Sequence, residues 1–250
     1  MHSIFCIKLE RLIIMTKLGT FYGIGVGPGD PDLLTVKAIN AIKKVDVLIA
    51  PKTEKKEGSV ALEIARPYLK SDIEILYQVF PMVKDFAESP EVFIENKNEI
   101  MSILSQGKNA AFLTIGDPMF YSTYIYIFKL LSEENINIET IPGIPAFLAI
   151  ASRIGRPVAY GNDILTIIPA TAEMNDIDSA LDSSNTSVLM KVYKNFDEVV
   201  ETLENHNMAW QAVLVSRCGL PDEKIINDIS EHKHEHLNYL STIITRKNEE

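Results

Sequence analysis

Two segments of this sequence combine small, acidic and hydroxyl residues at points where an apolar run stops. The first, residues 113–123, passes from an apolar run into a Gly-Asp-Pro turn (116–118) and then into three hydroxyl residues (121–123). The second, residues 23–30, is rich in glycine and also follows an apolar run. In open α/β sheets, ligands bind at the carboxyl ends of the strands, where such segments fall. The two segments therefore predict the walls of one ligand pocket.

The glycine-rich segment does not match the usual nucleotide-binding loops. Counted from Gly23, the third glycine position of a dinucleotide-binding loop holds Pro28, and counted from Gly25 it holds Asp30. Pro28 also lacks the N–H that would bind a phosphate, and no Gly-Lys-Ser or Gly-Lys-Thr follows. Two interpretations stay open: a turn in which Asp30 or Asp32 caps the next helix, or a bare backbone on which another group packs closely. We favour the close approach.

The Gly-Asp-Pro segment has two interpretations of its own. By itself it is a turn, since aspartate and glycine favour turns and proline fixes the next φ. Tyr121, Ser122 and Thr123 add a ligand-binding element, because we expect them in the first turn of a helix, beside backbone N–H groups that lack partners. Together with the glycine-rich segment, they predict a site for the polar or anionic end of a ligand.

Other candidate positions carry weaker signals. Residues 141–146 are either a domain hinge or a third wall of the pocket, because we place them after a strand that neighbours the Gly-Asp-Pro strand. Met190 closes a strand in the second half, where methionine is more often part of the core than a ligand contact. His232, His234 and His236 alternate, but their charged neighbours favour a solvated loop over a metal site.

Composition narrows the partners and the compartment. The 250 residues carry a net charge of −10, which argues against a nucleic-acid partner. The apolar runs are shorter than the roughly 18–20 residues that a membrane span needs. Cys6 and Cys218 form neither a disulfide framework nor a zinc spacing, so we expect two free thiols in a reducing cytoplasm and no bound metal. No Ser-His-Asp, Cys-His or paired-carboxylate pattern is visible, so the sequence predicts no particular catalytic residue.

The apolar periodicity predicts an α/β protein of two α/β domains with a cleft between them. In the first half, strands alternate with helices of about a dozen residues, which is typical of a mostly parallel sheet. The strands are expected at 20–26, 46–50 (closed by Pro51), 73–79, 109–115 and 136–141, and the helices at 33–44, 60–69, 91–106 and 121–133. Shorter strands follow at 165–169, 187–192, 213–216 and 240–245, with helices at 144–153, 177–181, 196–205 and 224–229. We expect an N-terminal extension over 1–16 and domains over 17–141 and 142–250.

Four motifs together resemble the tetrapyrrole (class III) S-adenosylmethionine-dependent methyltransferases in order and spacing. They are residues 23–35, 116–118, 142–144 and 189–191, and the resemblance extends over about 17–247. Within this family, residues 116–123 and 216–223 are most similar to the branch that methylates C20 of precorrin-2 or cobalt-precorrin-2 in cobalamin biosynthesis. The uroporphyrinogen branch would show Gly-Gly-Asp-Pro followed by Phe and Gly-Arg-Gly, which this chain lacks.

The resemblance implies a fold, a methyl donor and an assembly. It implies two α/β domains with S-adenosylmethionine in the cleft between them, and a homodimer. Asp117 is expected to shape the turn and bind the donor rather than to act as a general base. Pro145 stands where relatives commonly carry serine or threonine. Carried over position by position, the donor contacts would be Pro28, Ile115, Gly116, Asp117, Phe120, Ser122, Thr123, Pro145, Ala146, Met190 and Cys218.

A tetrapyrrole with peripheral carboxylates would need positive charge near the cleft. The basic residues that we expect to supply it are Lys52, Arg153, Arg156, Lys191 and Arg217. Between the metal-free and the cobalt-containing acceptor, we favour the cobalt-containing one. Methylation of a tetrapyrrole at another ring position, as for uroporphyrinogen III, precorrin-3 or precorrin-4, stays an alternative. So do a non-catalytic donor-binding domain and an RNA or protein methyltransferase of the same fold, although the net charge disfavours RNA.

Overall fold

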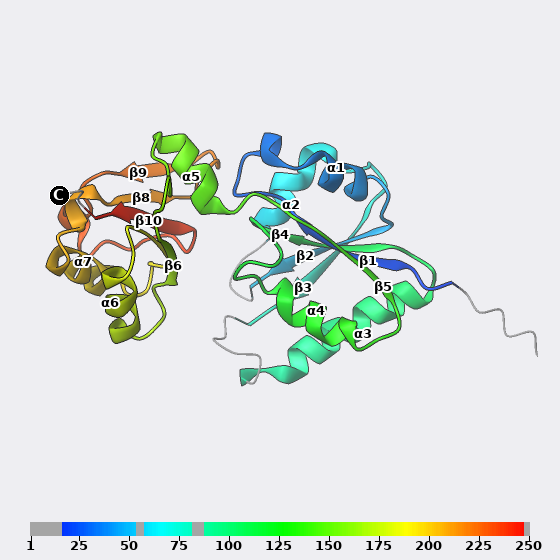
Figure 1. Ribbon diagram of the computed structural model, residues 1–250. Helices are drawn as coiled ribbons and strands as arrows, with labels where there is room; N and C mark the ends of the chain where they lie inside the picture. The colour runs from blue at the N-terminus through cyan, green and yellow to red at the C-terminus, as the bar shows by residue number, and fades with distance from the viewer. Residues whose placement is uncertain (1–16, 54–57, 82–87, 248–250) are drawn as a thin grey trace, which may run out of the picture.

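The computed structural model describes residues 17–53, 58–81 and 88–247. Two separate five-stranded sheets organise these residues, and a single segment after β5 leads from the first to the second (Figure 1). The predicted extension over 1–16 lies outside the described residues. The α/β architecture of each half confirms the predicted fold class, whereas the division into domains 17–141 and 142–250 stays a prediction.

The first sheet is entirely parallel, as its alternation of strands and helices predicts. Its strand order is β3-β2-β4-β1-β5, so the first strand of the chain lies between the fourth and the fifth. The strands are β1 (Thr20–Gly25), β2 (Val47–Lys52), β3 (Glu74–Val79), β4 (Ala110–Thr114) and β5 (Asn137–Ile141). The helices are α1 (Val36–Ile42), α2 (Val60–Ala65), α3 (Pro90–Ser105) and α4 (Tyr124–Ser132), with 3-10 turns at Pro31–Leu33 and Arg66–Tyr68.

Helices cover both faces of the first sheet because successive strand residues point to opposite sides. Leu48 of β2 packs with α1 and α2, whereas its neighbour Ile49 packs with the aromatic cluster under α3 and α4. In β1, Phe21 joins the aromatic cluster and Ile24 joins the aliphatic one. Strands that are buried on both faces read as continuous apolar runs, and this is why the sequence located them well.

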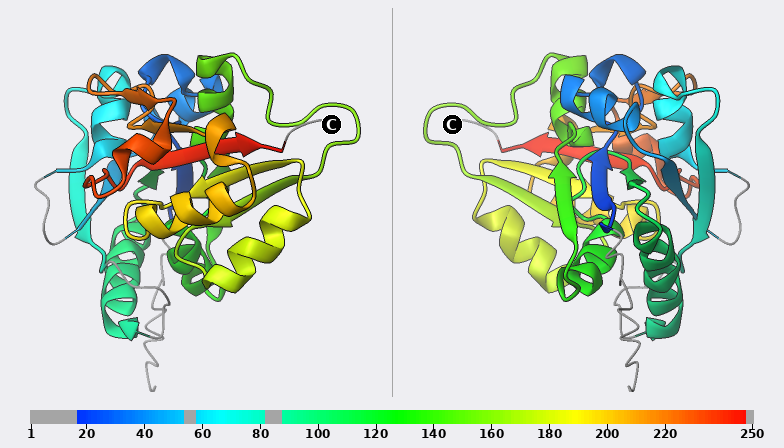
Figure 2. Two further views of the ribbon diagram at one scale, coloured as in Figure 1. Left: turned by 90° about the vertical axis from the view of Figure 1, so that its left-hand side faces the viewer. Right: turned by 90° about the vertical axis from the view of Figure 1, so that its right-hand side faces the viewer.

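The second sheet is mixed, with strand order β6-β7-β10-β8-β9. Helices α6 and α7 cover one face of it and α5 covers the other (Figure 1). Figure 2 shows the segment between α5 and β6 reaching out beyond the edge of this sheet. The elements are α5 (Ala146–Ile154), β6 (Leu165–Pro169), α6 (Met174–Asp182), β7 (Thr186–Met190), α7 (Phe196–Asn205), β8 (Val213–Ser216), β9 (Lys224–Ile226) and β10 (Ser241–Arg246), with 3-10 turns at Ala209–Gln211 and Ile229–His232.

Several predicted bounds shift by a few residues, and two predictions about elements are wrong. Pro51 does not close its strand, because β2 pairs with β4 only from Val47 to Ile49, so the N–H that proline lacks is not required there. The helix expected over 224–229 is wrong: Lys224–Ile226 is an edge strand that pairs antiparallel with β8. Pairing with an existing sheet edge outweighs the weak helical pattern of so short a segment.

Within the described ranges, no helix is both long enough and apolar enough to cross a bilayer.

Candidate functional site

The two segments that the sequence singled out are hydrogen-bonded to one another. Gly116 donates its N–H to the Gly27 carbonyl at 2.8 Å, and Gly27 donates back to the Gly116 carbonyl at 3.3 Å. The N–H of Val26 reaches the Thr114 carbonyl at 2.9 Å. The carboxyl ends of the neighbouring strands β1 and β4 thus continue into one joined structure, which we name the loop junction (residues 25–30, 114–118 and 141–145).

Glycines allow this junction to close. A Cβ built on Gly25 would lie 2.6 Å from the Gly116 oxygen, and one on Gly143 would lie 2.1 Å from the same atom. The predicted close approach therefore exists, but neighbouring backbone occupies it. The expectation that β5 lies next to the Gly-Asp-Pro strand β4 is wrong, since β1 lies between them. Residues 141–145 still reach the junction because Gly25, on that intervening strand, has no side chain.

Asp117 holds the junction through both carboxylate oxygens. Its Oδ1 accepts from the N–H of Met119 at 2.8 Å, which closes the turn. Its Oδ2 accepts from the N–H of Gly143 at 3.0 Å, which ties the turn to the segment leading into the second sheet. Hydrogen bonds to a charged acceptor are stronger than those between neutral groups. Asp117 therefore shapes the turn, whereas its binding of the donor stays a prediction.

The three hydroxyl residues do not lie in the first turn of a helix, which corrects our prediction. α4 begins at Tyr124, and Tyr121 has a φ of +47°, a left-handed conformation that no helix accommodates. The Ser122 hydroxyl accepts from the N–H of Tyr124 at 3.0 Å, so it caps the helix from outside. Thr123 occupies the N-cap position without a side-chain hydrogen bond to the helix.

Thr114 is a polar group at the junction that our sequence analysis missed. It is the last residue of β4, and its Oγ1 is buried with no hydrogen-bond partner among the described residues. A buried hydroxyl without a partner is costly, so this atom marks a place where a polar ligand group fits. In the sequence, the feature that could have identified this residue is a single threonine at the end of an otherwise apolar strand. Close by, Pro145 at the N-cap of α5 provides no side-chain cap for the first N–H groups of that helix.

An apolar wall completes the site from the second half. Phe120, from the loop after β4, packs against Phe147 of α5 with ring centroids 5.7 Å apart. Ala146, Met190 and Cys218 belong to the same apolar cluster. Four of the predicted donor contacts, from four separate segments, therefore meet in one cluster.

The two halves also meet through Gly29. A Cβ on Gly29 would lie 2.3 Å from the carbonyl oxygen of Cys218, so Pro28 and Gly29 abut the loop after β8. Ile115 packs on the aliphatic core of the first half together with Leu220 from that same loop. The loop that carries Pro28 and the loop that carries Cys218 are thereby in contact.

Cys218 lies in a setting that disfavours its thiolate form. Burial, followed by the negative charge of Glu223, raises the pKa of the Cys218 thiol to about 11. The Glu223 carboxylate also accepts from the N–H of Gly219 at 2.7 Å. A thiol that stays protonated at neutral pH packs as a small apolar group.

Two of the five predicted acceptor-binding cations are already paired. Arg153 donates its Nε to Glu223 Oε1 at 2.9 Å, and Arg217 donates its Nε to Asp222 Oδ1 at 2.6 Å. Both arginines lie at the same end of the second half. Their charges are partly neutralised before any ligand arrives.

Arg156 and Lys52 lie elsewhere. Arg156 donates Nη1 to the Gln211 carbonyl at 2.8 Å. Lys52, at the end of β2, places its ammonium 5.8 Å from the centre of the Tyr77 ring. The structure does not bring either of them to the loop junction.

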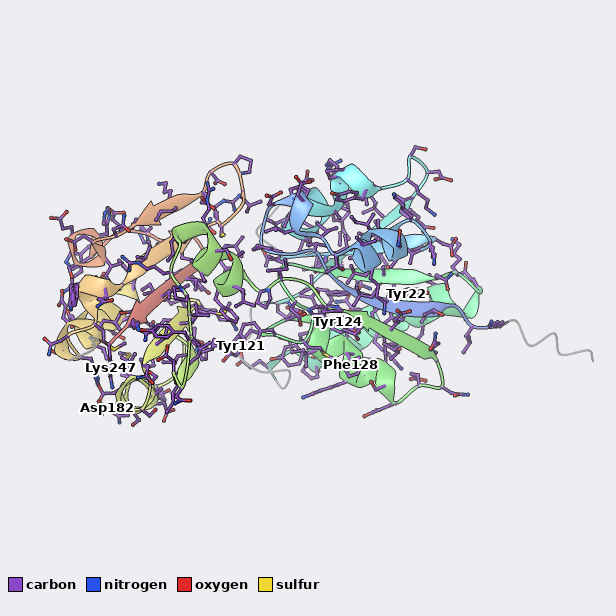
Figure 3. All side chains as sticks on the ribbon, turned by 45° about the horizontal axis from the view of Figure 1, so that its top comes forward. Tyr22, Tyr121, Tyr124, Phe128, Asp182 and Lys247 are labelled. Atoms are coloured by element: carbon purple, nitrogen blue, oxygen red, sulfur yellow. The ribbon has the colours of Figure 1, made fainter. Side chains whose placement is uncertain are left out.

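Lys191 lies between the two halves, where it contacts Tyr121. It follows β7 with a φ of +60°, and its ammonium lies 5.2 Å from the centre of the Tyr121 ring. Figure 3 shows Tyr121 where the two halves face one another, while Tyr22, Tyr124 and Phe128 lie within the first half.

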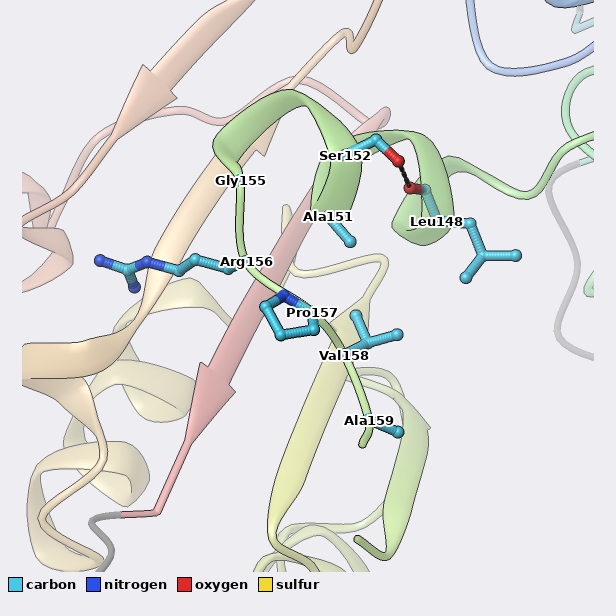
Figure 4. A pocket seen from close by; sticks show the side chains of 8 residues that line it. All are labelled: Leu148, Ala151, Ser152, Gly155, Arg156, Pro157, Val158 and Ala159. Atoms are coloured by element: carbon cyan, nitrogen blue, oxygen red, sulfur yellow. Dashed lines mark hydrogen bonds between the residues drawn. The ribbon is translucent and has the colours of Figure 1, made fainter. Parts of the chain in front are cut away.

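The surface also has two hollows that do not coincide with the loop junction. One of about 460 Å³ lies beneath α5 and is lined by Leu148, Ala151, Pro157 and Val158 (Figure 4). The other, of about 540 Å³, is partly polar, and Arg156, Arg246 and Lys247 contribute to its lining. Of the residues that the sequence predicts for the site, only Arg156 lines either hollow, so we retain the loop junction as the candidate site.

Two histidines of the triplet lie beside carboxylates. His232 Nδ1 lies 2.9 Å from Glu235 Oε1, and His234 Nδ1 lies 2.7 Å from Asp197 Oδ2. Across the part of the chain that the structure describes, no three histidine, cysteine, aspartate or glutamate side chains gather as they would around a metal ion.

Comparison with known proteins relates both the fold and the motifs to one group of enzymes. A family model described as Tetrapyrrole (Corrin/Porphyrin) Methylases matches residues 20–232. The cobalt-precorrin-2 C(20)-methyltransferase of Salmonella typhimurium is 34% identical over 230 residues, which is 92% of this chain and 97% of that protein. A Methanocaldococcus jannaschii protein named "Probable cobalt-precorrin-2 C(20)-methyltransferase" is 36% identical over 229 residues, 90% of this chain and 95% of its own. The uroporphyrin-III C-methyltransferase of Thermus thermophilus, in a crystal structure with S-adenosylhomocysteine, shares the fold with a TM-score of 0.68 at 19% identity, covering 92% of this chain and 98% of that one.

Proposed function

This chain belongs to the tetrapyrrole (corrin/porphyrin) methylase family, and from that membership we propose that it transfers a methyl group from S-adenosylmethionine to C20 of cobalt-precorrin-2. The observation that carries the proposal is the similarity, at 34% and 36% identity, to C20-methyltransferases over nearly their whole length. Both relatives are named for the cobalt-containing acceptor, which favours it over precorrin-2. The reaction is a step of cobalamin biosynthesis.

The residues of the loop junction fit the donor. S-adenosylmethionine supplies a methyl group activated by a positively charged sulfur, together with polar groups at both of its ends. The partnerless Thr114 hydroxyl and the uncapped start of α5 offer hydrogen bonds for such polar groups. Phe120, Ala146 and Met190 offer an apolar surface for the rest of the molecule.

The main task of the protein in this reaction is alignment. C20 forms a bond to the methyl carbon while the methyl–sulfur bond breaks, and the C20 hydrogen leaves as a proton. Such a displacement gains most from holding the reacting atoms in line. Asp117 serves that end by fixing the turn after β4 to the segment at Gly143, so that donor contacts from both halves keep one geometry.

We also propose that the chain acts as a cytoplasmic homodimer. Large apolar side chains in the second half are exposed and would be covered by a partner. They include Tyr160, Ile164 and Trp210, of which Trp210 is 65% exposed. Light scattering after size-exclusion chromatography tests the dimer, and a mass of one chain would overturn it.

Mass spectrometry after incubation tests the methyl transfer. The purified chain is mixed with S-adenosylmethionine and, separately, with cobalt-precorrin-2, precorrin-2 and uroporphyrinogen III. We expect a gain of one methyl on cobalt-precorrin-2, located at C20 by magnetic resonance. Methylation of another acceptor or another ring carbon would favour a different tetrapyrrole methylase. No gain on any of the three would overturn the proposal.

A further inference from the structure

Two residues in left-handed backbone conformation face one another between the halves. Tyr121, in the loop after β4, has a φ of +47°, and Lys191, directly after β7, has a φ of +60°. The Lys191 ammonium lies 5.2 Å from the centre of the Tyr121 ring, within the range of a cation–π interaction. The ends of the two sheets thus contact each other through an aromatic ring and a cation.

Tyrosine and lysine are both disfavoured in the left-handed conformation that these two positions adopt. Left-handed conformations are inexpensive for glycine and tolerable for asparagine, but they strain other side chains. Strained positions of this kind persist where the surrounding structure imposes them, and they cluster at ligand-binding sites. Two of them in direct contact indicate that the side chains of Tyr121 and Lys191 matter more than local backbone stability.

Within the described part of the chain, the charge of Lys191 has no counter-ion. The ammonium is half-buried, and burial lowers the pKa of Lys191 below its ordinary value. Among the described residues, no carboxylate forms an ion pair with it, whereas Arg153 and Arg217 are paired with Glu223 and Asp222. A half-buried cation that lies over an aromatic ring and pairs with no described carboxylate is well placed to bind an anion.

Lys191 also lies next to the apolar wall of the candidate site. β7 and β8 are parallel to one another, since each pairs antiparallel with β10, so Lys191 and Arg217 follow strands that end at the same edge of the second sheet. Met190, the residue before Lys191, belongs to the apolar wall of the candidate site. An anion held by Lys191 would therefore lie beside that wall.

We infer that Tyr121 and Lys191 form the site that binds a peripheral carboxylate of the tetrapyrrole acceptor, an inference that rests on the proposed function. Lys191 pairs with the carboxylate, and the Tyr121 ring holds the ammonium in place. This pair is the determinant that orients the ring of the acceptor against the loop junction. The donor also carries a carboxylate, and the test below separates the two sources.

Binding titrations test the inference without turnover. Uroporphyrin, a stable tetrapyrrole rich in carboxylates, and its methyl ester are titrated by fluorescence against the wild type and Lys191→Met. We expect uroporphyrin to bind Lys191→Met about tenfold or more weakly, because an ionic hydrogen bond is lost. The ester should bind both proteins with the same, weaker affinity. Lys194→Met removes an exposed lysine from the same loop and should leave the binding of uroporphyrin unchanged.

Further measurements separate the alternatives. Calorimetry with S-adenosylhomocysteine should give equal affinity for the wild type and Lys191→Met, and an equal loss for both ligands would assign the site to the donor carboxylate instead. Lys191→Gly relieves the left-handed strain, so it should unfold at the same or a higher temperature and still lose uroporphyrin affinity. Unchanged uroporphyrin affinity in Lys191→Met, or no binding by the wild type, would overturn the inference. Absence of methyl transfer by a wild type that binds uroporphyrin through Lys191 would overturn the proposed reaction alone.

Discussion

The loop junction and the Tyr121–Lys191 pair lie in the same candidate site, but they use their residues in opposite ways. At the junction, glycines remove side chains so that backbone can contact backbone, and both oxygens of Asp117 accept backbone N–H groups. In the pair, large side chains occupy left-handed positions that glycine would suit better, and the ammonium lies over a ring. The carboxylate of Asp117 is hydrogen-bonded within the protein, whereas the Lys191 ammonium forms no ion pair with a described residue. The comparison indicates that the junction is a rigid support and that the pair is reserved for a ligand.

The largest effect is expected from filling the junction. A methyl group added in Gly143→Ala would lie 2.1 Å from the Gly116 oxygen, and backbone on both sides prevents its accommodation. We expect the free energy of unfolding to fall by about 3 kcal/mol, which urea denaturation measures. Gly155→Ala is the control: its φ of +66° also strains alanine, but no atom lies within 4 Å, so only about 1 kcal/mol is expected. Equal losses in the two variants would mean that the junction is not tightly packed.

Removing the carboxylate of the junction comes next. Asp117→Ala loses the hydrogen bonds to Met119 and Gly143. We expect S-adenosylhomocysteine to bind roughly 10- to 100-fold more weakly by calorimetry, with a folded far-ultraviolet circular dichroism spectrum. If donor binding survives and only turnover falls, Asp117 takes part in the reaction instead of shaping the site.

The buried thiol beside the junction gives a smaller effect that depends on pH. Burial, with Glu223, raises the pKa of Cys218 from 9.0 to about 11 in the folded chain. The unfolded chain therefore releases this proton first as the pH rises, so the stabilisation is complete below pH 9 and is lost towards pH 11. Urea denaturation of the wild type and Cys218→Ala over this range should show a difference of roughly 1–2 kcal/mol in that loss. Parallel pH profiles of the two proteins would contradict the assignment.

The smallest effect is expected from a cation that already has a partner. Arg153 is exposed and paired with Glu223, so Arg153→Gln should change uroporphyrin affinity by less than about twofold. The same titration that detects Lys191→Met serves as the measurement. A loss as large as that of Lys191→Met would remove the distinction between paired and unpaired cations on which the comparison rests.

The sequence predicted those features that depend on local patterns. The strand Leu165–Pro169 and the helix Phe196–Asn205 have the predicted bounds, because apolar periodicity and turn residues are local signals. The meeting of residues 23–30 with the Gly-Asp-Pro turn also followed from general knowledge of where parallel strands end. The sequence analysis also predicted that Asp117 shapes the turn, and the hydrogen bonds of its carboxylate to Met119 and Gly143 agree with that prediction.

The features that the sequence missed depend on distant parts of the chain. The position of β1 between β4 and β5 is set by packing, and nothing in the residues 136–141 records which strand will lie beside them. The left-handed conformation of Tyr121 likewise arises from the loop that holds it, since tyrosine itself disfavours it. The missing partner of Thr114 and the contact of Lys191 with Tyr121 of the other half emerge only when the two halves of the described chain are placed together.

The strand order of the first sheet affects how the chain folds during its synthesis on the ribosome. β1 pairs with β4 from Phe21↔Ala110 and with β5 from Thr20↔Asn137, so both of its neighbours are synthesised long after it. Until they emerge, an apolar central strand has two open edges, which is the situation in which nascent chains aggregate or recruit chaperones. The pairing of residues so far apart in sequence also slows folding, because the entropy cost of closing a long loop comes before any stabilising contact forms. The strand that supports the candidate site is thus translated first among the strands of its sheet and completed last.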